Sequence, residues 1–539
     1  MRATSLFARD AVLAVIGLIA VMNHTAACGD DLRKPAAVAA EVDRLLEESW
    51  NSNDIAPADP ADDSAYLRRV YLDLAGRIPA VSELREFLAD ERPDKRTAIV
   101  EQLMDSPAYV RNFTTVWRNT LIPQANMQVE FRGVIPGFEA WLWERIADGR
   151  PYDEMVREII TADITPERVS GQALTATTTP DAFFVVRQLK PENLATGTSR
   201  VFLGVRLDCA QCHDHPFDKW KQRQFWNLAA FYSGFSTGTA AADNPQMMMF
   251  REDASSRSIA IPGTDETAAA IYLTGMSPSW DDPRETTPRE LLATWLTDPQ
   301  NPWFARMAAN RMWAQFFGRG IVNPVDDFSD NNPPSHPEVL NLLAEQFAVH
   351  DFDLKFLIRT LTSTRAYQLS SRQSHESQAD PSAFAKAALR GMTPEQYFDS
   401  LAEAVGYYQP YRSENPFVLD TNTPRSMFLE LFRDDAESPL DRETTILQAL
   451  AMMNGRFIDD ATSLDESQTL KAIAEFPLMT DDDRLETLFM ATVTRRPTVE
   501  EHTRFGQYLK SGGATGDSAA ALSDIFWALL NSSEFLLNH

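Results

Sequence analysis

Apolar residues recur three or four positions apart along most of the chain, which is the spacing of one face of an α-helix. Three stripes of this kind lie in the first third of the sequence: Val38, Val42, Leu45 and Leu46; Leu84, Phe87 and Leu88; and Phe138, Trp141, Leu142 and Ile146. The last stripe ends near Gly149, a residue type that commonly follows the end of a helix. The pattern predicts amphipathic helices over these segments.

Helix-start signals support the same interpretation. Four segments place a hydroxyl residue three positions before Glu or Gln: 287–290, 335–338, 393–396 and 498–501. In such a capping box the hydroxyl accepts a backbone N–H, and the acid or amide bonds back to the first residue. We therefore expect a helix to begin at each one. Strand-like segments are few, and 259–261 and 270–273 fit either one small hairpin or an extended loop.

These signals predict a mainly α fold of two helical domains joined by an irregular segment, with at most a small β-hairpin. Residues 236–286 are rich in Gly, Ala, Ser, Thr, Asp and Pro and form the expected linker. The linker separates an N-terminal helical domain, 28–235, from a C-terminal helical domain, 287–539. A chain of 539 residues is too long for a single core, which agrees with two domains.

Residues 1–27 have the features of a secretory signal peptide. Arg2 and Arg9 precede an uncharged apolar run, 11–22, and small residues follow this run at 25–27. The run is shorter than the roughly 20 apolar residues that a membrane-spanning helix needs. We therefore expect export to the periplasm or cell envelope. Cys28 is then either the lipid-modified first residue of a lipoprotein, anchored to a membrane, or an unmodified thiol beside a simple cleavage site.

The chain is acidic, with 77 Asp and Glu against 50 Lys and Arg and a net charge of −27. This balance excludes nucleic acid as a partner class, because phosphate binding needs clustered cationic side chains. The negative net charge favours solubility, but it does not indicate an oligomeric state. Only three cysteines occur, Cys28, Cys209 and Cys212, which is too few for a disulfide scaffold.

The densest chemistry in the sequence is the run Cys209-Ala210-Gln211-Cys212-His213-Asp214-His215. A Cys-x-x-Cys-His array is typical of c-type haem attachment, in which both thiols bond to haem and the histidine ligates iron. Under this interpretation Cys209, Cys212 and His213 hold haem c for electron transfer with a redox partner protein. A backbone carbonyl should then hold the second nitrogen of His213. By residue type, His336 and Met247 to Met249 are candidates for the sixth iron ligand.

Other chemistries fit the same residues. A site for zinc or another divalent metal would draw, besides the two thiols, on four neighbours: His213, Asp214, His215 and Asp218. The cysteines could instead form a redox or a structural disulfide, and a structural metal or disulfide would suit a non-redox binding or scaffold protein. The acidic pair Asp326 and Asp327 raises the further alternative of an extracytoplasmic hydrolase. Walker, His-Glu-x-x-His and EF-hand motifs are absent from the sequence.

The residues around the cluster resemble a known family. The runs 69–79, 202–205 and 209–218 are similar to the first of two paired domains of unknown function that occur in secreted proteins of planctomycete bacteria. Runs similar to the second domain are 301–306, 310–313, 317–322, 326–328, 333–338, 363–367, 448–450 and 454–457. The resemblance covers nearly all of the chain after residue 28.

Members of this family often carry a planctomycete-type cytochrome c domain upstream, which implies a redox setting. The stretch between Cys28 and the first family-like run is too short for such a domain. If this protein holds haem, the resemblance therefore leaves Cys209, Cys212 and His213 as its site. The activity of the family is undefined, so the resemblance implies a fold and a context and leaves the reaction open.

Overall fold

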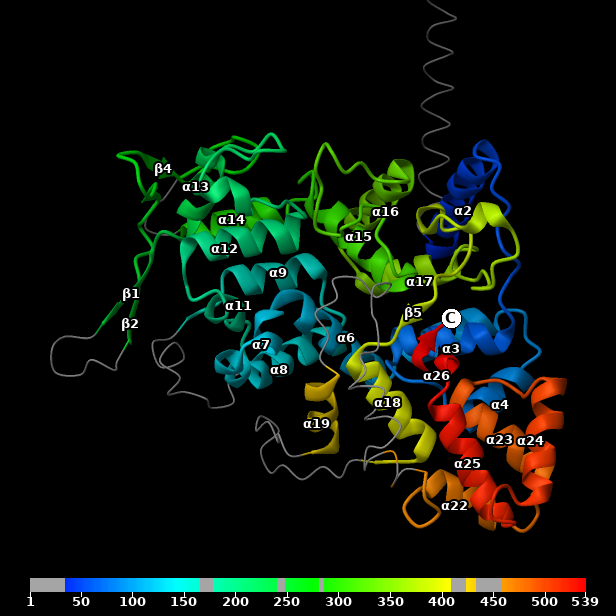
Figure 1. Cartoon of the computed structure of the whole chain (residues 1–539). Coiled ribbons are helices and arrows are strands. Elements are labelled where there is room, and N and C mark those ends of the chain that lie inside the picture. The colour runs from blue at the N-terminus through cyan, green and yellow to red at the C-terminus, as the bar shows by residue number, and fades with distance from the viewer. Residues whose placement is uncertain are drawn as a thin grey trace, which may run out of the picture.

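The computed structural model describes residues 34–164, 178–239, 248–280, 286–408, 423–432, 458, 460 and 462–539 (Figure 1). The expected signal peptide 1–27, Cys28 and the family-like runs 448–450 and 454–457 lie outside these residues. Export and lipidation therefore stay predictions. Among the described helices, none has both the length and the apolar character that crossing a bilayer requires.

The fold is mainly α, as the sequence predicts. The first helices are α2 (Pro35–Ser52), α3 (Asp63–Leu74), α4 (Val81–Ala89), α5 (Lys95–Met104), α6 (Pro107–Leu121), α7 (Gln124–Met127), η1 (Val129–Val134), α8 (Ile135–Ala147) and α9 (Tyr152–Ile160). After these come α11 (Ala182–Val185), α12 (Pro191–Thr198), the π-turn η2 (Ser199–Leu203), the 3₁₀ turn η3 (Asp208–Gln211), α13 (Gln222–Ala229) and η4 (Ala230–Tyr232). The three apolar stripes fall on α2, α4 and α8.

The later helices are α14 (Pro288–Leu296), α15 (Phe304–Phe317), α16 (Pro337–Val349), α17 (Leu354–Ser363), η5 (Glu376–Gln378), η6 (Pro381–Ala383), α18 (Pro394–Val405), α19 (Pro424–Leu431), α22 (Gln468–Glu475), α23 (Asp481–Val493), α24 (Val499–Ser511), α25 (Ser518–Leu530) and α26 (Ser533–Leu536). Strands in the described residues form three antiparallel pairs: β1 (Phe235–Thr239) with β2 (Met248–Glu252), β3 (Ser258–Ala260) with β4 (Thr267–Ala269), and β5 (Arg390–Gly391) with β6 (Leu537–Asn538). The expected small hairpin is β3–β4, whose second strand starts three residues earlier than predicted.

Capping boxes start three helices where the sequence predicts them. Thr287, Thr393 and Thr498 each accept the backbone N–H of the residue three positions later. At 335–338 a helix also begins, because α16 starts at Pro337, but the predicted capping box of Ser335 does not form: the N-cap is His336 and has no side-chain cap. The chain before α16 passes close to the Ile321 carbonyl, and both the backbone N–H and the hydroxyl of Ser335 donate to it, at 2.9 and 3.2 Å.

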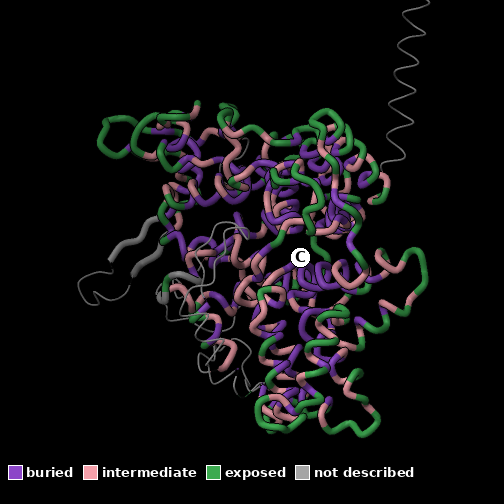
Figure 2. Tube along the Cα trace, turned by 45° about the vertical axis from the view of Figure 1, so that its right-hand side comes forward, coloured by how far each residue is buried: buried purple, intermediate pink, exposed green. Residues whose placement is uncertain are grey.

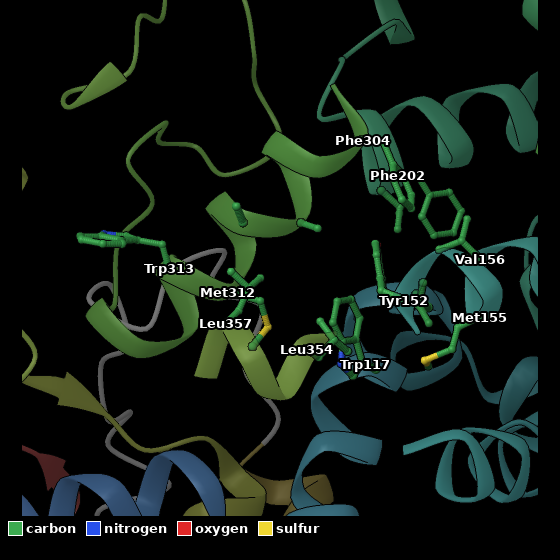
Figure 3. Close-up of a cluster of buried hydrophobic side chains, with 14 of the residues drawn as sticks. Trp117, Tyr152, Met155, Val156, Phe202, Phe304, Met312, Trp313, Leu354 and Leu357 are labelled. Atoms are coloured by element: carbon green, nitrogen blue, oxygen red, sulfur yellow. The ribbon is translucent and has the colours of Figure 1, made fainter. Parts of the chain in front are cut away.

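One buried cluster comprises residues between 38 and 385, together with Met490, and so includes helices on both sides of the 236–286 segment. Tyr152 of α9 is an example of contact between the two sets of helices. Its ring lies 5.1 Å from Trp117 of α6 and stacks at 5.3 Å on Phe304 of α15 (Figure 3). Exposed positions gather in loops and at helix ends around this interior (Figure 2). The helices before and after the 236–286 segment therefore stabilise one another through shared apolar burial.

The described part of the 236–286 segment packs against this shared core. Ile261, Ala268 and Leu273 are buried members of the same cluster. The ring of Tyr272 stacks between Trp295 of α14, at 4.9 Å, and Phe231 of η4, at 5.2 Å. The segment thus bridges helices that precede and follow it.

A second buried cluster comprises residues 392–535 of α18 to α26, with Leu72 and Ile78 added from the α3 region. A buried polar contact set joins it to the first. Asp73 of α3 accepts hydrogen bonds from Tyr367 Oη at 2.8 Å, Arg390 Nη2 at 2.9 Å and Asn538 Nδ2 at 2.9 Å. The C terminus consequently lies beside α3, as Figure 1 shows.

Candidate functional site

The Cys-x-x-Cys-His array lies in residues 204–219, between η2 and α13, which we call the cysteine loop. Gly204 ends η2 with a φ of +67°, and the 3₁₀ turn η3 follows at Asp208–Gln211. Leu207 and Ala210 are fully buried and anchor the turn, whereas Cys209 and Cys212 are exposed. Cys209 lies within the turn and Cys212 is the residue directly after it, so two thiols are exposed to solvent at this turn.

Both Cys209 and Cys212 are free thiols in the structure. Neither the redox disulfide nor the structural disulfide that the sequence allows is therefore formed here. The thiols are accessible to a group that approaches from solvent.

His213 is exposed, and its Nδ1 lies 2.7 Å from the backbone carbonyl oxygen of Asp214. A carbonyl oxygen only accepts hydrogen bonds, so in the neutral imidazole this contact places the proton on Nδ1 and the lone pair on Nε2. A backbone carbonyl on one ring nitrogen is the arrangement expected for a histidine whose other nitrogen ligates a metal ion.

The acidic and histidine neighbours of His213 are occupied in local turns. Asp214 accepts the backbone N–H of Gln222 at 3.1 Å and pairs with Lys221 Nζ at 3.1 Å, and these contacts lower the pKa of its carboxyl. His215 Nδ1 accepts the Phe217 N–H at 3.3 Å, and Asp218 accepts the Lys219 N–H at 2.7 Å. Within the described residues, no three His, Cys, Asp or Glu side chains are grouped to hold a metal ion. The geometry does not assemble the zinc or divalent-metal set, which stays a prediction.

Helix α13 supports the inner side of the loop. Trp226 Nε1 donates to the Gln211 carbonyl at 3.0 Å, and Gln222 Nε2 donates to the Cys212 carbonyl at 2.9 Å. Trp226 is 4% exposed and Trp220 is 3% exposed, so the aromatic side chains after the cluster are mostly core. Phe217 is the exception, because 79% of it is exposed beside the histidines.

Residues 326–332 support the outer side of the loop. The Phe328 N–H donates to the Gly204 carbonyl at 2.8 Å, and Asn331 Nδ2 donates to the Phe217 carbonyl. A Cβ added to Gly204 would stand 2.4 Å from the Phe328 ring, so glycine permits this close approach. Sequence reasoning missed these contacts. The only available signal was that 326–328 is a family-like run.

Asp326 does not have the environment of a catalytic acid. Its carboxylate pairs with Arg200 and, at 2.6 Å, with Arg206. Burial alone would raise the pKa of Asp326, but the two guanidinium groups outweigh burial and hold the pKa below its ordinary value. The backbone of Asp327 makes hydrogen bonds: its N–H donates to Pro324, and its carbonyl accepts from Ser329 and Asn332. The acid–base role considered for this pair therefore gives way to an ion-pair role for Asp326.

Of the sixth-ligand candidates, His336 lies among residues outside the cysteine loop. His336 is 7% exposed, lies against the Phe384 ring at 5.6 Å and contacts Ser335 Oγ at 3.2 Å. Met248 and Met249 open strand β2, and Met247 lies outside the described residues. A small pocket lined by Tyr109, Trp117 and neighbouring residues contains no residue of the cysteine loop. Because Cys209, Cys212 and His213 are exposed, a group bound by them would lie on the surface.

Comparison with known protein families agrees with the resemblance seen in the sequence. Residues 41–237 match the family PSCyt2, protein of unknown function (DUF1549), and residues 288–509 match PSD1, protein of unknown function (DUF1553). The chain therefore belongs to the planctomycete family in which these two domains are paired. Neither a curated protein nor a solved structure matches it. The cysteine loop lies in the first matched region, and the 326–332 segment that supports it lies in the second.

Proposed function

We propose that this protein is an exported redox protein that carries a c-type haem on Cys209 and Cys212, with His213 as an axial iron ligand. One observation carries the proposal: one exposed free thiol lies in a 3₁₀ turn, a second directly follows that turn, and the next histidine has its Nδ1 on a backbone carbonyl. The name of the first matched family, which refers to planctomycete cytochromes, points in the same direction.

The residues present fit such a group. Each thiol can add its S–H across one vinyl group, forming one C–S and one C–H bond in place of the vinyl π bond, so that no atom leaves. This addition needs both sulfur atoms to be reduced and accessible, and they are. The lone pair on His213 Nε2 is available for iron, and the Asp214 carbonyl fixes the ring through Nδ1.

Once bound, haem supplies one-electron chemistry. This chain's residues would hold it and expose it. The contacts of Trp226 and Gln222 with the loop carbonyls keep the backbone in place, and the open surface around Phe217 lets a redox partner protein approach. The proposal includes export, because haem attachment in bacteria takes place outside the cytoplasm. It also includes anchoring to a membrane if Cys28 is lipidated.

The test is to produce the full chain with its export signal in cells that contain haem-maturation machinery. Visible spectra and intact masses are then compared between the natural chain and Cys209→Ser and Cys212→Ser variants, with Cys28→Ser as the matched thiol control. We expect a Soret band and one haem of added mass in the natural chain and in the Cys28 variant only. A mass that equals the bare chain, with no Soret band, would falsify the proposal. Elemental analysis of the same sample shows whether zinc is bound instead.

A further inference from the structure

The cysteine loop is held at both ends by a segment that is far away in the sequence. At its start, Gly204 accepts the Phe328 N–H; near its end, Phe217 accepts from Asn331, and Lys219 Nζ pairs with Asp330 at 3.2 Å. Between these points, the side chains of Cys209, Cys212 and His213 face solvent. The 326–332 segment therefore spans the loop without covering its reactive side chains.

Asp326 makes the strongest of these contacts. One carboxylate oxygen pairs with Arg200 Nε in η2, and the other accepts both Nε and Nη2 of Arg206, at 3.1 and 2.6 Å. The two arginines lie on either side of the left-handed turn at Gly204. The side chain of Asp326 is 17% exposed, so solvent screens this double ion pair less than a pair on the open surface.

We infer that Asp326 is a positioning residue for the cysteine loop. By joining Arg200 to Arg206, its carboxylate fixes the turn from which η3 projects, and η3 in turn sets the direction of Cys209 and Cys212. The second matched region thus completes a site whose reactive side chains all belong to the first. The effect of Asp326 on the conformation of the loop is inferred from geometry alone, whereas its effect on haem attachment rests on the proposed function.

A second ion pair of the chain serves as a control, because it can distinguish a local role of Asp326 in the cysteine loop from a general contribution to stability. Asp399 of α18 pairs with Arg425 of α19 through both carboxylate oxygens, at 3.0 and 3.2 Å. Its side chain is 19% exposed, close to the 17% of Asp326. Both residues lie in the second matched region, but the partner of Asp399 is Arg425, which is outside the cysteine loop.

The experiment measures hydrogen–deuterium exchange, by mass spectrometry, in full-length protein made without haem. Asp326→Asn should speed exchange in peptides covering 205–222 by about tenfold, because charge-assisted bonds that hold the loop closed are lost. Asp399→Asn should leave those peptides at the natural rate, and Asp326→Glu, which keeps the charge, should restore part of the protection. With haem-maturation machinery present, the haem-to-chain ratio of Asp326→Asn should fall by about half or more.

Unchanged loop exchange in Asp326→Asn, or an equal increase in Asp399→Asn, overturns the inference. If Asp326→Asn does not fold, Arg206→Gln removes one arm of the contact and is judged by the same exchange criterion. A natural chain that takes up no haem contradicts the proposed function, while the exchange comparison still decides the role of Asp326.

Discussion

The buried contact set around Asp73 gives the sharpest prediction about how the two cores depend on each other. The side chain of Asp73 is 1% exposed, and its partner Arg390 is 8% exposed. In Asp73→Asn one carboxylate oxygen becomes an NH₂ group that faces the donors of Tyr367, Arg390 or Asn538, and Arg390 loses its counter-charge. Breaking a buried pair by removing one partner costs about 3–5 kcal/mol.

That cost is a large share of the roughly 5–15 kcal/mol by which folded domains are stable. Asp399→Asn, which breaks a pair with side chains 32% and 19% exposed, should cost about 1 kcal/mol or less. Tyr367→Phe, which removes one of the hydrogen bonds to Asp73, should cost about 1 kcal/mol. Urea unfolding, followed by far-ultraviolet circular dichroism, gives the loss in free energy of unfolding for each of the three variants. A loss below about 1 kcal/mol for Asp73→Asn, or one equal to that of Asp399→Asn, would refute the reasoning.

Three further predictions concern the loop. His213→Ala should leave the far-ultraviolet spectrum unchanged and alter or abolish the visible spectrum of protein made with haem-maturation machinery. Gly204→Ala should cost about 1–3 kcal/mol, measured by thermal unfolding, because its φ is +67° and its Cβ would meet Phe328. The lowered pKa of Asp326 means that its ion pairs stabilise the loop fully above the ordinary value of 3.8. Loop protection should therefore be constant from about pH 5 to 7 and fall as acid protonates Asp326 at still lower pH; Asp326→Asn should lack this acid-dependent loss.

Local features of this fold are readable from the sequence because short-range physics decides them. The stripe at Val38 to Leu46 predicts α2, and the box at Thr287 predicts the start of α14. The failure at Ser335 shows the limit of this approach. Its hydroxyl does not cap the helix and donates to the Ile321 carbonyl, which only the tertiary fold brings within reach.

The candidate site divides in the same way. The thiols and His213 are adjacent in sequence, so their chemistry could be predicted from spacing alone. The carboxylate that holds Arg206 comes from Asp326, a long way along the chain, and a single sequence carries no record of that pairing. For the same reason, the stacking of Tyr152 on Phe304, which joins helices from both matched regions, could not be foreseen. Asp326, which the sequence offers as a candidate catalytic acid, thus has a structural role in the fold.

The central claim is tested most directly by mass spectrometry of one peptide. Trypsin cleavage after Arg206 and Lys219 releases residues 207–219, which contain Cys209, Cys212 and His213. From protein exported in cells with haem-maturation machinery, this peptide should carry the mass of one haem after denaturation, and it should lose that mass in Cys209→Ser/Cys212→Ser protein. Recovery of the peptide from such cells with two unmodified thiols would contradict the account.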